Sequence, residues 1–374
     1  MFRKLKIPRT IVVLGVVSLL NDMASEMVAP IMPIFLTTVL HASIPAVGVV
    51  EGVAEATASL AKYGFGRWSD LIQKRKSFVV AGYSLGAISK LLVGLATAWG
   101  WVLGARVIDR LGKGLRTAAR DSIITANAPL AQRGGLFGFQ RAMDRLGAVF
   151  GPLLALLILA FATDNLRLVF LLAFIPGCLC VGLLLCYVRE PAPDPALTAT
   201  ATTPAAATPI VKNKLRWSDI PRPVKWFLLV NIIFALGNSS DAFVILRGQD
   251  LGLSLTVIIF MYVCHNAVQS LFATPAGRWA DRLGSKRVIL AGWIVFAVVY
   301  AGFGLINHGW WLWLLFPIYG LYLAFTDGVG RAYISSLVPL RQSGTYFGLY
   351  HGLIAFGNLT ASIIGGLLWS TYHP

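Results

Sequence analysis

Acidic residues are few in this chain, and charge of either sign is scarce. The 374 residues include 16 Asp and Glu against 32 Lys and Arg, and only 13% of positions are charged. Hydrophobic residues make up 57% of the sequence, and the mean hydropathy is +0.72. A soluble protein cannot bury that much apolar surface, so we expect most of it to face lipid.

The surplus of basic residues gives a formal net charge of +16, which in a soluble protein would suggest nucleic acid. The positions of the charges exclude nucleic acid as a partner, because the basic residues crowd into alternate loops. They are Arg3, Lys4, Lys6 and Arg9; Lys74, Arg75 and Lys76; Arg116, Arg120 and Arg133; Lys212, Lys214, Arg216, Arg222 and Lys225; and Arg278, Arg282, Lys286 and Arg287. This positive-inside pattern predicts a multi-pass protein of the plasma membrane (in a bacterium the inner membrane) with a cytoplasmic N-terminus.

Motifs of catalysis and metal binding are missing from the sequence. It holds no phosphate-binding glycine loop, no catalytic triad and no metal-ligand spacing, which argues against an ATP-driven pump, a lipid-modifying transferase or any other enzyme. The 4 cysteines lie in apolar runs and are expected to be packing residues. His265 and His351 are isolated, so we expect packing roles for them too. The sequence therefore predicts no cofactor and no metal.

Long apolar runs recur throughout the chain. A membrane-crossing helix needs ~20 mainly apolar residues. Eleven candidate spans fall at 10–38, 44–65, 78–97, 100–123, 134–162, 167–188, 224–247, 252–274, 287–306, 309–337 and 344–370. The predicted fold class is an all-α polytopic membrane protein with about 11 visible spans.

A long-range repeat divides these spans into two sets. Gly66-Arg67-Trp68-Ser69-Asp70 reappears as Gly277-Arg278-Trp279-Ala280-Asp281. Residues around Pro129 recur at one constant offset around Pro339. Duplicated halves are typical of secondary transporters.

The repeat also sets the domain boundaries. We predict two pseudo-symmetric helical bundles, an N-terminal six-span bundle at 1–189 and a C-terminal bundle of about five spans at 224–374. Residues 190–223 are rich in Pro, Ala and Thr and are expected to form a cytoplasmic linker. The second bundle lacks a counterpart of the last span of the first.

The repeated motif resembles that of the major facilitator superfamily, whose members carry a Gly-x-x-x-Asp-(Arg)-x-Gly-(Arg/Lys) loop after spans 2 and 8. The second copy fits well, and the first has Leu71 and Gln73 where Arg and Gly are usual. The resemblance implies that this loop controls an inner gate and does not bind substrate. The gate residues so implied are Gly66, Asp70, Arg75, Gly277, Asp281 and Arg282. The alternative is simple charge anchoring at the membrane surface.

A second motif bears on the direction of transport. Gly138, Gly147, Gly151 and Pro152 have the spacing of a span 5 pattern similar to that of antiporters of the family, which are mainly exporters. The usual final Gly-Gly is Ala155-Leu156 here. The alternative is ordinary packing of small residues between helices.

Carboxylates at membrane depth suggest proton coupling. Asp22 and Glu26 stand four residues apart on the first span and so share one face, and Glu51 and Glu55 repeat the spacing on the second. Like charges in a low dielectric cannot all remain ionised, so we expect at least one of these groups to exchange protons. The alternative is that they are structural partners of bases on the fourth span.

Those bases and their neighbours form the last constellation. Arg106, Asp109 and Arg110 lie on one face of the fourth span with Lys113, and the fifth span carries Gln140, Arg141, Asp144 and Arg145. Arg106 resembles the Arg of a motif of the family. Three interpretations stay open for the arginines: neutralising the acids and relaying protons, clamping an anionic substrate, or forming an interhelical ion-pair lattice.

Together these features predict a monomeric, proton-coupled exporter of a small molecule that works by alternating access in the lipid bilayer. The expected coupling residues are Asp22, Glu26, Glu55, Arg106, Asp109 and Arg110, with Arg106 and Arg110 as charge partners of the acids. The expected substrate-binding residues are Asn21, Gln140, Arg141, Asp144, Asn238, Asp241 and Tyr350. The alternatives are an organic-anion importer or exchanger with Arg106, Arg110 and Arg141 as its clamp, and a membrane sensor that does not transport.

Overall fold

The computed structural model describes residues 6–161, 165–189, 217–238, 248 and 251–372. Among these residues all regular structure is helical. The long helices of the N-terminal half are α1 (Arg9–Val28), α3 (Ile44–Ile72), α4 (Arg75–Gly94), α5 (Trp99–Asn127), α6 (Arg133–Phe161) and α7 (Leu166–Tyr187). Those of the C-terminal half are α9 (Arg222–Gly237), α11 (Leu255–Leu283), α12 (Ser285–Leu305), α13 (Leu312–Leu337) and α14 (Ser343–Tyr372).

Each predicted span coincides with one of these eleven long helices, although the predicted span 224–247 is described only as far as residue 238. Within the described residues, 6 helical segments are long and apolar enough to cross a membrane by length and composition alone. The other long helices include α3, α5 and α11, which carry the motif residues and the charged face. Several of their charged residues, among them Asp70, Asp121 and Asp281, contact other helices, as described below.

The first span is interrupted near its middle. Pro30 and Pro33 follow the end of α1, and the chain continues as the short α2 (Met32–Ile34) and a π-helical turn, η1 (Phe35–Val39). A proline removes a backbone donor and clashes with the preceding turn, which explains the break. The span therefore begins as predicted but is not one continuous helix.

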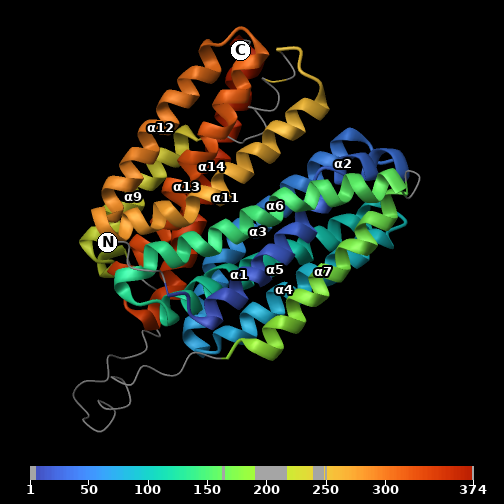
Figure 1. Cartoon of the computed structure of the whole chain (residues 1–374). Coiled ribbons are helices and arrows are strands. Elements are labelled where there is room, and N and C mark those ends of the chain that lie inside the picture. The colour runs from blue at the N-terminus through green and yellow to red at the C-terminus, as the bar shows by residue number, and fades with distance from the viewer. Residues whose placement is uncertain (1–5, 162–164, 190–216, 239–247, 249–250, 373–374) are drawn as a thin grey trace, which may run out of the picture.

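The long helices form two bundles that follow the two halves of the sequence. Figure 1 shows α1 and α3 to α7 as one group and α9 and α11 to α14 as the other, and the two groups diverge from one end. We call this the inner end: α1, α6, α9 and α14 begin there, and α5 and α13 finish there. The opposite end, where the bundles stand apart, is the outer end.

The packing of apolar side chains explains this shape. One core contains residues of both halves, such as Leu14 and Phe137 with Val224 and Phe347. Two further cores each belong to a single half, one around Phe170 and the other around Phe316. Burial of apolar surface therefore joins the bundles at the inner end, whereas each bundle has its own core at the outer end.

Candidate functional site

Asp70, the last residue of the first motif copy, contacts the start of a helix from the other half. It is 7% exposed. Its carboxylate accepts hydrogen bonds from the backbone N–H of Gly344 at 3.1 Å and from the hydroxyl of Thr345 at 2.8 Å, in the first turn of α14. Arg75 lies 3.4 Å from the same carboxylate and donates to the Leu340 carbonyl at 2.5 Å. A carboxylate at a helix N-terminus satisfies unpaired amides and complements the positive end of the helix dipole.

Asp281, in the second motif copy, makes the corresponding contact in the opposite direction. Its carboxylate accepts from the backbone N–H groups of Gly134 at 2.7 Å and Gly135 at 2.8 Å, at the start of α6. Arg282 follows it in the last turn of α11 and is exposed. Each copy of the motif thus caps a helix of the other half. Both contacts cross between the bundles.

The motif glycines allow this close approach. A Cβ added to Gly66 would overlap the backbone carbonyl of Gly344, and one added to Gly277 would overlap that of Gly134. Gly138 faces a backbone carbonyl of α11 in the same way. Because only glycine leaves room for backbone against backbone, these positions bring α3 onto α14 and α6 onto α11.

Deeper between the bundles, six charged side chains form a closed ring of alternating sign. Arg120 and Asp121 lie on α5, Arg141 and Asp144 on α6, and Asp327 and Arg331 on α13. In order round the ring, the contacts are Arg120–Asp121 at 3.4 Å, Asp121–Arg331 at 3.5 Å, Arg331–Asp327 at 2.9 Å, Asp327–Arg141, Arg141–Asp144 at 2.9 Å and Asp144–Arg120 at 3.7 Å. We refer to these residues as the ion ring.

The ion ring lies in the inner half of the molecule. Asp121 stands six residues before the end of α5, ~9 Å along the axis. Asp144 stands eleven residues after the start of α6, ~16 Å along. Asp121 is fully buried and Arg331 is 2% exposed. Buried charges persist when they are paired and hydrogen-bonded, and here each carboxylate has at least two cationic neighbours.

Neutral groups complete the network around the ring. Gln140 donates to Asp144 at 2.7 Å and accepts from Arg331 at 3.0 Å, which joins α6 to α13. His351 of α14 lies 2.9 Å from Asp121. His351, which was expected to be a packing residue, is thus hydrogen-bonded to a carboxylate 230 positions away.

Sequence reasoning did not assign four members of the ring to a site: Arg120, Asp121, Asp327 and Arg331. A signal was present in the repeat, since Asp121 and Arg331 are separated by the same offset as Pro129 and Pro339. Equivalent residues of two symmetric halves face each other when they lie close to the symmetry axis. Opposite charges at equivalent positions there favour an ion pair. Of the interpretations left open for Arg141, the structure shows the ion-pair lattice.

The predicted coupling acids lie where α1 crosses α6. A Cβ on Gly147 would lie 2.8 Å from the Met23 nitrogen and 3.2 Å from the Asp22 Cβ, and one on Gly151 would lie 2.8 Å from the Glu26 Cβ. Asn21 donates to Asp22 at 2.9 Å. The acids predicted on span 1 and the glycine motif predicted on span 5 therefore lie at the same helix crossing. Pro152 of that motif lies inside α6. The side chain of Glu55 lies outside the described residues.

The fourth-span charges have partners on their own helix and on α4. Asp109 lies 3.9 Å from Lys90 of α4 and 3.7 Å from Arg110, and it accepts from Ser89 at 3.4 Å. Arg110 thus lies beside Asp109 of its own helix, and it also interacts electrostatically with Glu26 of α1. Lys90, which sequence reasoning did not single out, is 4% exposed and anchors α4 to this face. Arg106 lies on the same helix and is half-buried.

The remaining substrate-binding predictions are only partly brought together. Asn21 and Gln140 lie on α1 and α6, Asn238 follows α9, and Asp241 lies outside the described residues. Asn238 donates to the Tyr322 hydroxyl at 3.3 Å. Tyr350 is 6% exposed and stacks on Phe227 in the shared inner core. In this conformation Tyr350 is therefore a packing residue of the inner end.

Aromatic side chains line the outer part of the C-terminal bundle, a feature that the sequence did not single out. Phe234, Phe296, Tyr319 and Tyr322 contact one another with ring centroids 4.8 to 6.5 Å apart. His265 bonds the Phe316 carbonyl at 3.2 Å. The packing role expected for His265 is thus observed.

Two helical bundles with a repeated interbundle contact define a membrane transporter of duplicated halves. The model of the Major Facilitator Superfamily matches residues 14–247 and 227–373. The chain belongs to that superfamily.

Individual relatives agree with this assignment. An uncharacterized MFS-type transporter of Methanocaldococcus jannaschii is 34% identical over 97% of this chain and 89% of its own length. The class D tetracycline resistance protein of Salmonella ordonez is 25% identical over 95% of this chain and 87% of its own. Among solved structures, the human organic anion transporter MFSD10 superposes with a TM-score of 0.77 at 16% identity, over 96% of this chain and 93% of that one. At that identity the likeness concerns the fold.

Proposed function

We propose that this chain is a proton-coupled exporter of a small molecule, with Asp22 and Glu26 as its coupling acids. The main support for this proposal is the crossing of α1 and α6, where the glycine motif packs against the turns of α1 that bear Asp22 and Glu26. The relationship to a tetracycline resistance protein supports export. The N-terminus and the inner end face the cytoplasm in this proposal, the membrane is the plasma membrane, and the working unit is a monomer.

The conformation described here is closed at the inner end, since the Asp70 and Asp281 contacts and the ion ring all cross between the bundles there. Alternating access requires these contacts to break. The ion ring can divide at two links, Arg141–Asp327 and Asp121–Arg331, into two neutral parts. Four members stay on the N-terminal bundle and two on the other. No uncompensated charge is left in either half, which keeps the cost of opening low.

Proton coupling then concerns α1, whose Asp22 interacts electrostatically with Asp144 and Arg120 of the ion ring. Asp22 and Glu26 lie at the outer side of the ring, on a helix whose neighbour α6 also carries ring members. A proton bound to either acid changes the local charge at the α1–α6 crossing. Binding of protons from outside and of substrate from inside would then favour opposite conformations, which is the requirement for exchange.

The test uses proteoliposomes with an imposed pH gradient and a panel of candidate substrates. Asp22→Asn and Glu26→Gln are each expected to lose uphill transport while retaining downhill exchange. Asp219→Asn, at an exposed position shortly before α9, is the control and should behave as the wild type. Full gradient-driven transport by both acid variants would contradict the coupling assignment. Absence of transport for every compound in the panel would favour the sensor alternative.

Exchange of an organic anion is the second candidate, and one observation bears on it. Arg141, the central member of the expected clamp, is held by both Asp144 and Asp327. An anionic substrate would have to displace one carboxylate. The same proteoliposomes separate the candidates, because anion exchange without coupling would be insensitive to the pH gradient.

A further inference from the structure

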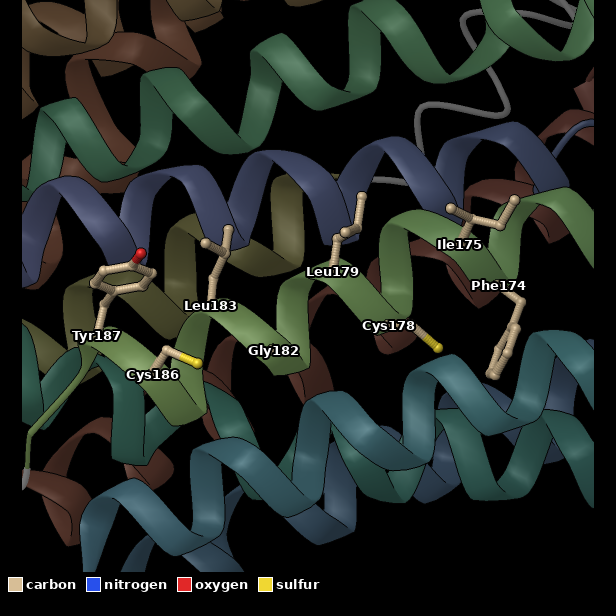
Figure 2. Close-up of a pocket in the computed structure, with 8 residues that line it drawn as sticks. All are labelled: Phe174, Ile175, Cys178, Leu179, Gly182, Leu183, Cys186 and Tyr187. Atoms are coloured by element: carbon tan, nitrogen blue, oxygen red, sulfur yellow. The ribbon is translucent and has the colours of Figure 1, made fainter.

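Gln269 of α11 is a fully buried amide whose polar atoms make no hydrogen bond. It is 0% exposed, and neither its Nε2 nor its Oε1 has a partner or can be reached by water in this conformation. Within the described residues it is the one side chain with two such atoms, since every other affected side chain has only one. The residues of α7 that line the groove in Figure 2 have none.

Gln269 lies at mid-depth, where the two bundles meet. It stands fourteen residues from either end of α11, ~21 Å along the axis. About one turn earlier, His265 bonds a backbone carbonyl of α13 at 3.2 Å, and Asn266 accepts from Arg145 of α6 at 3.1 Å. Residues three and four positions apart share a helix face, so Gln269 faces both α6 and α13.

The helix α6 that covers Gln269 belongs to the other bundle. Contacts between α6 and α11 recur about once per turn, from the inner end to mid-depth, in the order Gly134–Gly277, Gly138–Ala273, Ala142–Ser270 and Arg145–Asn266. Gln269 lies on α11 between the last two of these contacts. Closing the inner end therefore packs α6 over the amide, and separating the bundles returns the amide to water.

Gln140 of α6 is a second fully buried amide in the same region, but its hydrogen bonds are complete. Its Nε2 donates to Ser18 at 3.1 Å and to Asp144 at 2.7 Å, and its Oε1 accepts from Arg331 at 3.0 Å. Burying a polar group is favourable only when its hydrogen bonds to water are replaced. The two glutamines should therefore act on closure in opposite directions.

We propose that Gln269 destabilises the inner-closed conformation and so sets how readily the inner end opens. Desolvation of its amide offsets part of the stabilisation that comes from the Asp70 and Asp281 contacts and from the ion ring. Alternating access requires that each conformation can be left, and an unsatisfied amide in the closed one reduces the difference in free energy between the two. This inference rests on the alternating access of the proposed function, and not on the coupling role of Asp22 and Glu26.

The test replaces the amide with an apolar side chain of similar length. Gln269→Met removes both polar atoms and keeps a side chain between α6 and α13. The measurement is the rate at which an impermeant thiol reagent, applied from the cytoplasmic side, labels Ser122→Cys in a cysteine-free background. Ser122 is fully buried, so labelling requires opening. Labelling should slow by about tenfold, and the unfolding temperature should rise.

The matched control is Gln140→Met, which makes the same chemical change at an equally buried position whose partners are present. It should accelerate labelling and lower the unfolding temperature, because Asp144 and Arg331 each lose a hydrogen bond. Unchanged or faster labelling in both Gln269→Met and Gln269→Leu would overturn the proposal. Slower labelling in Gln140→Met would do the same, since it would indicate a general effect of apolar substitution.

Asp70→Asn distinguishes a failure of this inference from a failure of the proposed function. If Asp70→Asn accelerates labelling while the Gln269 variants leave it unchanged, alternating access stands and the role of Gln269 is refuted. If Asp70→Asn also leaves labelling unchanged, the inner end does not open in the proposed way and both are refuted.

Discussion

Single carboxylates make the contacts that join the two bundles. Asp70 and Asp281 each accept backbone N–H groups at the start of a helix from the opposite half. Each carboxylate lies close against a glycine, since a Cβ on Gly344 would lie 2.8 Å from the Asp70 oxygen and one on Gly134 would lie 2.7 Å from the Asp281 oxygen. Asn in place of Asp keeps the shape but lacks the charge and presents an N–H₂ group to other donors.

We therefore predict that Asp70→Asn or Asp281→Asn opens the inner end. Loss of a charge-assisted contact worth ~1.5–3 kcal/mol shifts a balanced equilibrium by about tenfold or more. The measurement is the rate at which an impermeant thiol reagent, applied from the cytoplasmic side, labels Ser122→Cys in a cysteine-free background. Ser122 is fully buried and contacts Ser343 across the bundles at 2.9 Å. Labelling should accelerate while substrate affinity in a conformationally locked protein stays constant.

Asp219→Asn serves as the control for labelling, since it removes an acid from the same end without touching either contact. If Asp70→Asn abolished substrate binding in the locked protein and left labelling unchanged, the motif would belong to the substrate path.

Helix α6 takes part in the Asp281 contact, the ion ring and the crossing with α1, in that order along its length. Its first turn receives Asp281, its middle carries Gln140, Arg141 and Asp144, and Gly147 and Gly151 pack on α1. Helix α14 repeats the scheme with Thr345, His351 and Gly357, but Gly357 packs against Ala235 and not against an acid. The halves are therefore alike in the contacts of the repeated motif and different at the level of Asp22 and Glu26.

Gly151→Ala is expected to destabilise the N-terminal bundle and impair transport. The added Cβ would lie 2.7 Å from the Met23 carbonyl oxygen and 2.8 Å from the Glu26 Cβ, and since backbone cannot give way easily, the helices must separate at a cost of ~1–3 kcal/mol. The unfolding temperature of the purified protein measures this effect. Gly104→Ala on α5 has no atom within 4 Å of its Cβ and should be neutral or stabilising. An unchanged unfolding temperature for Gly151→Ala would show that α1 and α6 do not pack this closely.

The apolar contacts and the ion pairs that join the two bundles lie at the same end of the molecule. The shared core and the ion ring both lie at the inner end, and the outer end holds separate cores. Because the ring divides into two neutral parts, its contribution to closure lies in the links that cross the interface. Arg141–Asp327 and Asp121–Arg331 are those links, with His351 and Gln140 beside them.

A double-mutant cycle on Arg141 and Asp327 should reveal a cross-bundle coupling. Asp327→Asn alone leaves Arg141 and Arg331 without a shared acceptor and should accelerate labelling of the buried thiol more than tenfold. The double variant with Arg141→Gln should recover part of that loss, with a coupling energy of ~0.5–3 kcal/mol. Asp109→Asn, which breaks pairs within one bundle, is the control and should not change labelling. A coupling energy of zero would show that the Arg141–Asp327 pair of the ion ring does not stabilise the closed inner end.

The sequence by itself determined the spans, the duplication and the repeated motif. These are local properties: about twenty apolar residues make a span wherever they occur, and a motif recurs as a string of letters. It also placed Asp22 and Glu26 on one helix face, because helical periodicity is local.

Only the tertiary structure decided which partners the charged side chains contact. Asp70 meets Gly344 across 274 positions, and Asp327 meets Arg141 across 186. Such pairs depend on which faces the bundles present to each other and on the conformation in which they meet. For this reason the sequence did not reveal that Asp109 lies beside Lys90 or that His351 lies beside Asp121. A buried charge takes the nearest partner that packing provides, and packing is a property of the whole fold.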